Sequence, residues 1–100
     1  MIEPRDPDFE ARVRASFAAQ SAMKSLQIQL LDLQPGGVTM QLEKSDHLLQ
    51  QQGFMHGGVL AAGLDSACGF AALTLSAPSV EVLSIEFKTS FFRPVTTDKV

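Results

Sequence analysis

The first quarter of the chain carries its large apolar side chains at helical spacing. Phe9, Val13 and Phe17 recur every four residues and therefore share one face of a helix. The preceding stretch Asp6-Pro7-Asp8 is typical of a helix start, because Asp accepts from free backbone amides and Pro fits the first helical position. This pattern predicts an amphipathic helix over residues 8–23 that covers a sheet.

From residue 26 the hydrophobic pattern changes to a period of two. Apolar and polar side chains alternate over residues 26–30, with a second leucine at position 31, and again over residues 38–43. Gly36-Gly37, with Pro35 before it, lies between the two runs and is a turn signal. We therefore expect an antiparallel hairpin with one solvent-facing side, followed by a polar loop over residues 44–52.

Residues 57–75 are small or apolar in nearly every position, and only Asp65, Ser66 and Thr74 are polar. A helix that is apolar all round is a buried helix, and we expect one over residues 53–72. Gly63 and Gly69 each cost about 1 kcal/mol relative to Ala inside a helix. This cost suggests that a sheet or a ligand packs close to the helix backbone.

A long strand is predicted over residues 80–92, ended by Pro94. Its alternation places four large side chains on one face, namely Leu83, Ile85, Phe87 and Phe91. Residues 97–100 resemble a turn that enters another strand. Three strands and the start of a fourth are too few to enclose a helix that is apolar on all sides. We therefore expect residues 1–100 to be one α+β domain, truncated before its C-terminal strands.

Composition and charge argue against several classes of function. With 45% apolar and 19% charged residues, the chain has the composition of a globular domain rather than a disordered one. A net charge of −3 without any basic run argues against nucleic acid as a partner. Asp65, near the middle of the longest apolar stretch, argues against a membrane span. The charged amino terminus lacks the apolar core of a signal peptide, so we expect a cytoplasmic protein.

The glycine-rich stretch before the second helix is a candidate for chemistry. A helix amino end exposes unpaired backbone N–H groups with partial positive charge. Gly57 and Gly58 let a ligand approach those groups, because no side chain stands in the way. The arrangement suits an oxyanion site for the tetrahedral intermediate of acyl transfer, although a glycine-rich turn before a helix explains the same residues.

Asp65 is the stronger indication of catalysis. A carboxylate within a buried helix is costly unless it has partners, and such groups are enriched at active sites. Asp65 could act as general base to a water or attack as a nucleophile. The alternative is a structural aspartate, satisfied by Ser66 or by a backbone amide.

Distance prevents one helix from holding both parts of such a site. Eight residue steps between Gly57 and Asp65 correspond to about 12 Å along a helix. A reacting carbonyl must lie about 3 Å from the oxyanion donor and from the base or its water. Two antiparallel helices across a twofold axis would meet this requirement, with Gly57 of one chain facing Asp65 of the other. We therefore expect a symmetric dimer with two equivalent sites.

Other polar residues are weaker candidates. Ser84, on the strand expected beside the helix, either helps to hold the water or is an ordinary solvent-side serine. His56 either braces the turn before the helix or acts as a base. Arg93, at the strand end, suits a phosphate of a cofactor-like substrate. We interpret Cys68 as a core residue, because about 18 Å of helix separates it from His56. No ligand spacing in the sequence indicates a metal site.

Several stretches resemble the hotdog-fold thioesterases of the PaaI-like family. They are Gly53-Phe54-Met55-His56-Gly57-Gly58-Val59, Asp65-Ser66-Ala67, Leu83-Ser84-Ile85-Glu86-Phe87-Lys88 and Phe92-Arg93-Pro94. The resemblance implies a hotdog fold, in which a curved antiparallel sheet wraps a long central helix. It also implies homodimers or homotetramers that hydrolyse acyl-CoA thioesters without a metal or another cofactor.

The resemblance also assigns roles to residues of this chain. Gly57 offers the oxyanion N–H, Asp65 is the base or nucleophile, and Ser84 lies where relatives place a hydroxyl near the water. Relatives often have an Asn ahead of the His-Gly-Gly stretch, and Gln50 takes that catalytic position here. The expected substrate contacts are His56, Gly58, Ser66 and Arg93.

Two alternatives to a thioesterase fit part of the pattern. A non-catalytic acyl-CoA-binding module on the same fold would keep the pocket without needing Asp65. A hotdog hydratase or dehydratase typically needs a histidine paired with an acid near the substrate. His56 and Asp65 lie on nearly opposite sides of one helix, which disfavours such a pair.

Overall fold

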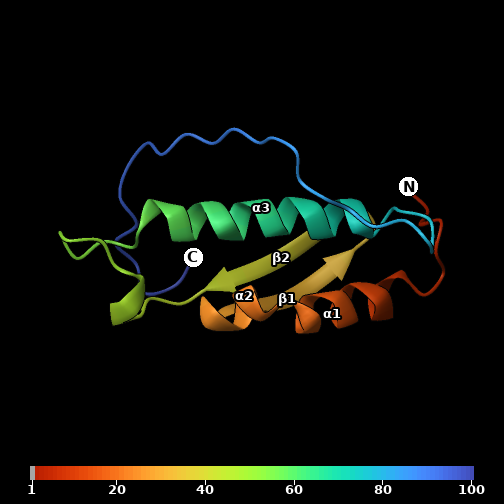
Figure 1. The fold of residues 1–100 in the computed structure, drawn as a ribbon, viewed down its shortest axis with the longest axis horizontal. Helices are drawn as coiled ribbons and strands as arrows, with labels where there is room; N and C mark the ends of the chain where they lie inside the picture. The colour runs from red at the N-terminus through yellow and green to blue at the C-terminus, as the bar shows by residue number, and fades with distance from the viewer. Residues whose placement is uncertain (1) are drawn as a thin grey trace.

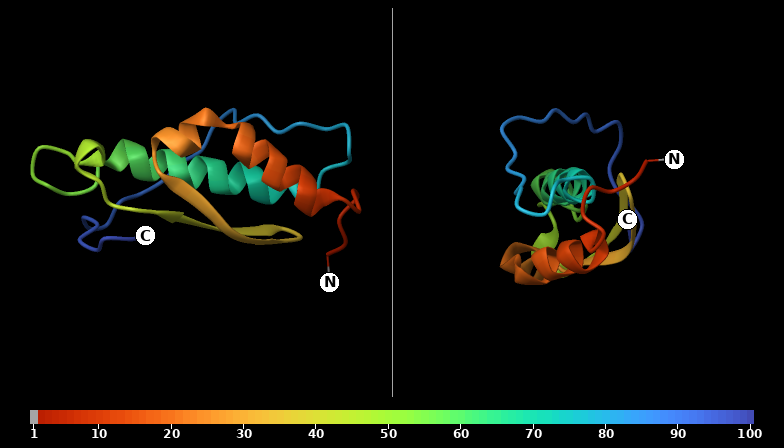
Figure 2. Two further views of the ribbon diagram at one scale, coloured as in Figure 1. Left: turned by 90° about the horizontal axis from the view of Figure 1, so that it is seen from below. Right: turned by 90° about the vertical axis from the view of Figure 1, so that its right-hand side faces the viewer.

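Helices and a β-hairpin meet around a shared core in the computed structural model, which describes residues 2–100 (Figure 1). The elements along the chain are α1 (Phe9–Ala19), α2 (Ser21–Ser25), β1 (Ile28–Gln34), β2 (Gly37–Leu42), the 3-10 turn η1 (Asp46–Leu48) and α3 (Gly57–Leu73). Figure 2 shows α3 almost end-on, with the hairpin to one side, α1 below, and the chain after residue 80 arching over it.

The helix expected over residues 8–23 is broken at Gln20, where the backbone becomes extended between α1 and α2. In an unbroken helix, Met23 would point away from the line through Val13 and Phe17. The break turns Met23 inward, where only 2% of its surface is exposed. Tertiary packing therefore overrides the helical pattern here.

The predicted hairpin is confirmed, with β1 antiparallel to β2 and Ile28 paired with Leu42. Its turn lies one residue earlier than the Gly-Gly pair, because Gln34 pairs with Gly37. Gly36 adopts a φ of +83°, which is the conformation that a type II turn requires of the residue after proline.

A bulge at Leu31 interrupts the register of β1 between Leu30 and Asp32. Up to this point the even-numbered residues of the strand face the core, and beyond it the odd-numbered ones do. Leu33 is consequently buried, whereas Leu31 has 50% of its surface exposed.

The core consists of two apolar clusters that share contacts with Phe17 and Met40. One joins α2, the hairpin and the loop before α3, and contains Met23, Ile28, Leu42, Leu48 and Met55. The other joins α1, β1 and α3, and contains Val13, Leu33, Phe70 and Leu73. The ring of Phe17 also packs edge-on against that of Phe70, with centroids 5.8 Å apart. These contacts fix α3 between α1 and the hairpin.

The strand expected over residues 80–92 is not formed: the segment is extended but pairs with no strand among residues 2–100. Leu83 and Ile85 accordingly expose 89% and 97% of their surface. A strand needs a hydrogen-bonded partner, and this segment arches over α3 instead of lying beside the hairpin. The last residues of the chain pair with the end of β2 and with the residues after it. Val100 and Leu42 exchange two backbone hydrogen bonds of 2.8 and 3.0 Å, as the pattern of residues 97–100 predicted.

α3 begins at Gly57, later than expected, and it is only partly buried. Leu64 is 46% exposed, and together with Cys68 and Ala72 it forms an exposed apolar stripe along one side of the helix. The expectations of a fully buried helix and of a core position for Cys68 are therefore wrong for this chain, because neither α1 nor the hairpin covers that side. Within the described residues, no helix has the length and apolar character needed to cross a membrane.

Candidate active site

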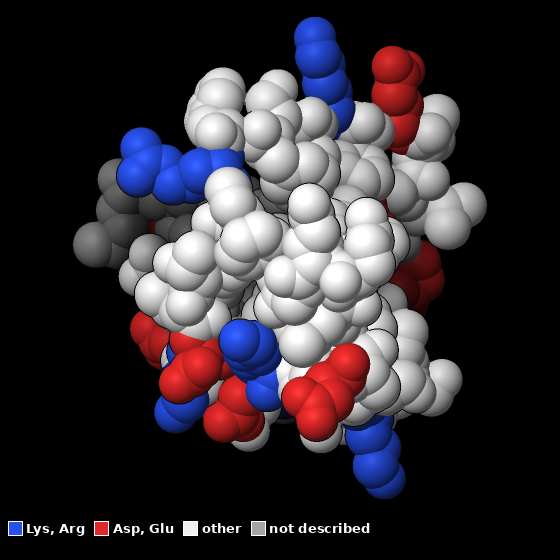
Figure 3. All heavy atoms as spheres, turned by 90° about the vertical axis from the view of Figure 1, so that its left-hand side faces the viewer, with Lys and Arg blue, Asp and Glu red and all other residues white. Residues whose placement is uncertain are grey.

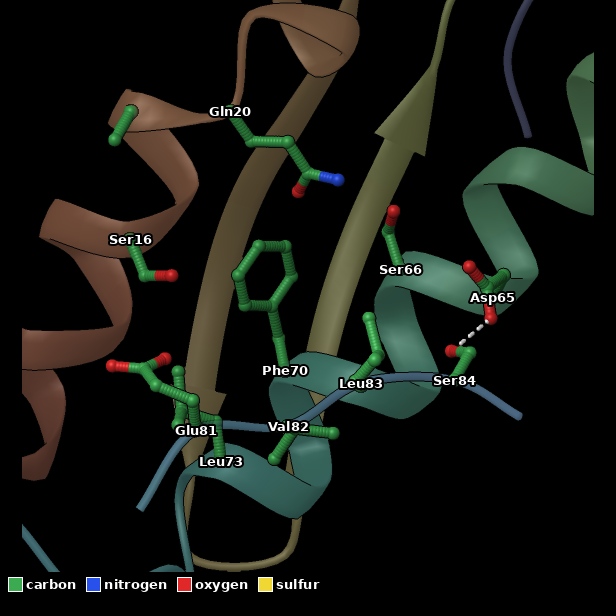
Figure 4. A pocket seen from close by; sticks show the side chains of 12 residues that line it. Ser16, Gln20, Asp65, Ser66, Phe70, Leu73, Glu81, Val82, Leu83 and Ser84 are labelled. Carbon is green, nitrogen blue, oxygen red and sulfur yellow. Dashed lines mark hydrogen bonds between the residues drawn. The ribbon is translucent and has the colours of Figure 1, made fainter. Parts of the chain in front are cut away.

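Asp65 and Ser84 are joined by a hydrogen bond (Figure 4). Ser84 Oγ donates to Asp65 Oδ1 at 2.6 Å. Asp65 lies in the third turn of α3, and Ser84 lies on the extended segment that leaves the end of α3 and runs back along it. Asp65 is half-buried, so the expectation that it lies in a dry interior is wrong for a single chain. The hydrogen bond nevertheless fixes one carboxylate oxygen and leaves the other for a ligand.

A cavity of about 540 Å³ opens beside this pair, between α1, α3 and residues 81–84. In Figure 4, Phe70 lies between Ser16 and Gln20 on α1 and Ser66 on α3. The polar side chains that line the cavity are Ser16, Gln20, Asp65, Ser66, Glu81 and Ser84. A carboxylate on such a wall can hold a water against the carbonyl of a bound ester or thioester.

His56 caps the amino end of α3 with its ring. Nδ1 of His56 accepts from the Gly58 N–H at 2.8 Å, which gives His56 a bracing role. The Gly57 N–H, in contrast, donates to no acceptor within residues 2–100. Gly57 therefore keeps an amide for a ligand at the positive end of the helix dipole.

A second cavity, of about 420 Å³, lies at this amino end. Gln50, Gly57 and Arg93 line it together with aromatic side chains that include Phe91. The Phe91 ring lies 3.5 Å from the place that a β-carbon on residue 57 would take. In the described chain Arg93 pairs with no carboxylate, which leaves its guanidinium for an anionic ligand.

Gln50 braces its own loop. Its carboxamide oxygen accepts from the backbone N–H groups of Gln52 (2.6 Å) and Phe54 (3.1 Å). Its amide nitrogen donates to the Gln52 side chain at 3.1 Å, which leaves one N–H of that nitrogen for a ligand. The catalytic role expected for Gln50 stays a prediction, and this geometry restricts it to hydrogen-bond donation.

The candidate residues fall into two groups along α3. The carboxylate half-site contains Asp65, Ser66 and Ser84, and the amide half-site contains Gln50, Gly57 and Arg93. About 12 Å of helix separates the two, so a single chain does not bring the base and the oxyanion donor together.

Apart from Arg93, the residues of the amide half-site come from an uncharged part of the chain. Residues 47–64 contain no Asp, Glu, Lys or Arg. Figure 3 shows this end of the molecule with an uncharged centre and charged side chains around it. Among residues 2–100, no three His, Cys, Asp or Glu side chains gather as metal ligands would. The positive charge at the amide half-site therefore comes from the Arg93 guanidinium and from the helix end.

Sequence reasoning missed a polar line on α1 that borders the carboxylate half-site. Ser16 and Gln20 line its cavity, and Arg12 donates from Nη1 to the Ala77 carbonyl at 2.7 Å. Glu81, which also lines the cavity, was missed as well. A signal was present, because Arg12, Ser16 and Gln20 recur every four residues and so share one side of the helix.

Solved structures similar to this chain share its arrangement of the hairpin and the long helix. A thioesterase family protein from Silicibacter pomeroyi is 38% identical, with a TM-score of 0.89, and the match covers 91% of this chain and 67% of that one. The E. coli PaaI protein from the phenylacetic acid degradation operon is 18% identical, with a TM-score of 0.78 over 87% of this chain and 61% of that one. The second likeness concerns the fold alone, and it confirms the predicted α+β hotdog class.

Sequence comparison points in the same direction. A Saccharolobus solfataricus protein, whose name assigns it provisionally to the esterases, is 25% identical over 77 residues, which are 77% of this chain. This chain spans 54% of the length of that curated relative. The family model described as the thioesterase superfamily matches residues 52–100, the part that contains both half-sites except Gln50. On this match and on its identity to the Silicibacter protein, the chain belongs to the hotdog-fold thioesterase superfamily.

Proposed function

We propose that this chain takes part in the hydrolysis of an acyl-CoA thioester to the free acid and CoA. The observation that carries the proposal is the Asp65 carboxylate, held by Ser84 on the wall of a cavity of about 540 Å³. A water attacks the thioester carbonyl while Asp65 takes its proton, the C–S bond breaks, and the proton passes to the departing sulfur. In the nucleophilic variant, Asp65 attacks the carbonyl itself, the C–S bond breaks, and CoA leaves as a thiolate that takes a proton from solvent. Water then hydrolyses the acyl-Asp65 anhydride, which releases the free acid and restores the carboxylate.

The Gly57 N–H is the proposed donor to the oxyanion that forms during the attack. Two observations support this role: the Gly57 amide has no acceptor among residues 2–100, and it lies at the positive end of α3. A donor of this kind is typically worth about 10²–10³ in rate. His56 holds the neighbouring Gly58 amide and so directs a ligand to Gly57.

A homodimer, or a homotetramer built from such dimers, would complete the site. The amide half-site of one protomer would face the carboxylate half-site of its partner, which removes the separation of about 12 Å within a chain. Ser66 would then contact the acyl group, and Arg93 would contact a phosphate of CoA. We place residues 1–100 in a single hotdog domain and propose that the protein acts in the cytoplasm, where acyl-CoA is available.

Replacing Asp65 with Asn tests the chemistry. The protein expressed from its complete reading frame is incubated with benzoyl-CoA and octanoyl-CoA while thiol release is followed. Asp65→Asn keeps the shape but cannot take a proton, so we expect kcat to fall by about 10²–10⁴. Asp32→Asn, at an exposed carboxylate on β1, is the matched control and should retain activity. Wild-type protein that binds both thioesters without releasing thiol would instead be the non-catalytic binding module.

Mixing two inactive variants tests the shared site. Gly57→Pro removes the N–H, and Pro is tolerated at the first position of a helix. His56 already has the extended backbone that precedes a proline (φ −62°, ψ 132°). Mixed dimers of Asp65→Asn and Gly57→Pro chains contain one intact site, so random mixing should restore about a quarter of wild-type activity. Absence of recovery, with mixed dimers shown to form, would refute the two-chain site.

A further inference from the structure

Few contacts hold the segment that carries Ser84. Within residues 2–100, the backbone of residues 81–97 makes no backbone–backbone hydrogen bond before the pairing of residues 98–100 with the end of β2. The start of the segment, over residues 80–84, is fixed by two side chains. Ser84 reaches Asp65, and Arg12 of α1 donates to the carbonyl of Val80.

Arg12 links α1 to the chain that leaves α3. Its Nη1 donates to the carbonyls of Ala77 (2.7 Å) and Ser76 (3.5 Å), and its Nη2 donates to that of Val80. These carbonyls follow the carboxyl end of α3, where a cation is favoured by the helix dipole. Asp6 lies 3.9 Å from Nη1 and orients the guanidinium from the other side.

We infer that Arg12 is a positioning residue for the hydrolysis proposed above. Its fork holds the turn over residues 77–80 against α1, and the position of this turn decides where Ser84, four residues later, meets the Asp65 carboxylate. Arg12 itself does not line the cavity beside Asp65. It therefore acts through the backbone and Ser84, and it does not touch the substrate. This inference rests on the proposed function, because it assigns a purpose to the Asp65–Ser84 pair.

The planar fork explains why arginine is suited to this position. Arg12 reaches three carbonyls from one head group, whereas lysine offers a single charged centre on a flexible stem. Residues 77 and 80 are already joined by the hydrogen bond from the Val80 N–H to the Ala77 carbonyl (3.0 Å). A lysine would keep the charge near this turn but would not hold both of its carbonyls against α1. Arg12→Lys should therefore retain part of the effect, and Arg12→Met should lose it.

Kinetics with benzoyl-CoA and octanoyl-CoA test the inference in the protein from the complete reading frame. Arg12→Met should lower kcat by about 10- to 100-fold, which is the range for a misplaced catalytic group. KM should stay within about twofold, because Arg12 is not part of the cavity wall. Arg12→Lys should fall between Arg12→Met and wild type. The control is Arg14→Met, which loses only an exposed pair with Glu10.

A double-mutant cycle separates positioning from a general loss of stability. In a Ser84→Ala background, Arg12→Met should lower kcat by no more than about twofold further, because its effect passes through Ser84. A full additional loss, or an equal loss in Arg14→Met, would overturn the inference.

An NMR readout keeps this test distinct from that of the proposed function. Arg12→Met should shift the backbone amide resonances of Ser84 and Asp65, whereas Arg14→Met should leave both in place. Unshifted resonances in Arg12→Met would refute the positioning role even if the wild-type protein hydrolyses thioesters. If the wild-type protein hydrolyses neither thioester but Arg12→Met still shifts these resonances, the structural link between Arg12 and Ser84 is supported and the proposed reaction is refuted.

Discussion

Thr74 connects the turn of the hairpin to the end of α3, and its replacement with Val should be costly. The residue is fully buried, with 0% of its surface exposed. Its Oγ1 donates to the Ala71 carbonyl at 2.6 Å and accepts from the Gly36 N–H at 2.8 Å. Val has nearly the same shape but no hydroxyl, so Thr74→Val removes both hydrogen bonds with little change in packing.

The magnitude follows from what is left unpaired. A backbone N–H without a partner costs about 1–3 kcal/mol, and the lost bond to the Ala71 carbonyl adds about 1 kcal/mol. A buried methyl group in place of the hydroxyl returns roughly 1 kcal/mol. The expected loss in the free energy of unfolding is therefore about 2 kcal/mol, which lowers Tm by roughly 8–16 °C in a domain of this size.

Urea unfolding of both forms measures this loss. The midpoint should fall while the m-value stays constant, because the surface exposed on unfolding is unchanged. Thr39→Val, at an exposed position of β2, is the control and should stay within about 0.5 kcal/mol of wild type. Equal effects of the two substitutions would show that the Gly36 amide finds another acceptor and that Thr74 does not connect the hairpin to α3.

Two further substitutions test local features. Gln27 has a φ of +57° at the end of α2, so Gln27→Gly should stabilise the protein by roughly 1 kcal/mol, whereas Gln29→Gly inside β1 should destabilise it in thermal melts. Gln50→Ala removes the acceptor of two loop amides, so hydrogen exchange of the Phe54 amide should accelerate, while Gln51→Ala should leave it unchanged. Unchanged exchange in Gln50→Ala would contradict the bracing role.

Alternation of apolar and polar residues was sufficient to predict the hairpin, because a strand with one buried side imposes a period of two. The details that depended on backbone conformation were not predicted in this way. The central residues of the turn are Pro35-Gly36 and not Gly36-Gly37. A type II turn needs a positive φ only at its third residue, and Gly36 provides it. The bulge at Leu31 coincides with a shift in the alternation that the prediction did not use, because apolar residues occupy even positions up to Leu30 and odd positions at Leu31 and Leu33.

The interruption of the first helix shows where local pattern gives way to packing. Gln20 and Gln27 are neither Gly nor Pro, yet one ends α1 and the other has a left-handed backbone after α2. Burial of Met23 decides both, since it requires a short second helix turned toward the core. No sequence signal marks such breaks, because the residues at the break do not cause it.

The segment over residues 80–92 shows that an extended backbone conformation is not by itself a β-strand. Its alternating pattern predicted a strand, whereas the structure has an unpaired chain there that places Ser84 beside α3. Pairing depends on a partner, and among residues 2–100 no strand lies alongside this segment. Arg12 was unpredictable for a related reason, since it binds backbone carbonyls more than 60 residues away and carbonyls have no sequence signature.

Electrostatics favours the separation of the two half-sites along α3. A carboxylate next to Gly57 would compete with the oxyanion for the same free amide, and two negative charges within a few ångströms would repel each other. Eight residue steps place Asp65 beyond the first turn, where the field of the helix end has largely decayed. In the proposed dimer, the same helix would then offer its amide to one substrate and its carboxylate to another. In such an arrangement, moving the carboxylate to the first turn, as in Leu60→Asp with Asp65→Asn, should fail to restore hydrolysis even though an acid lies close to Gly57.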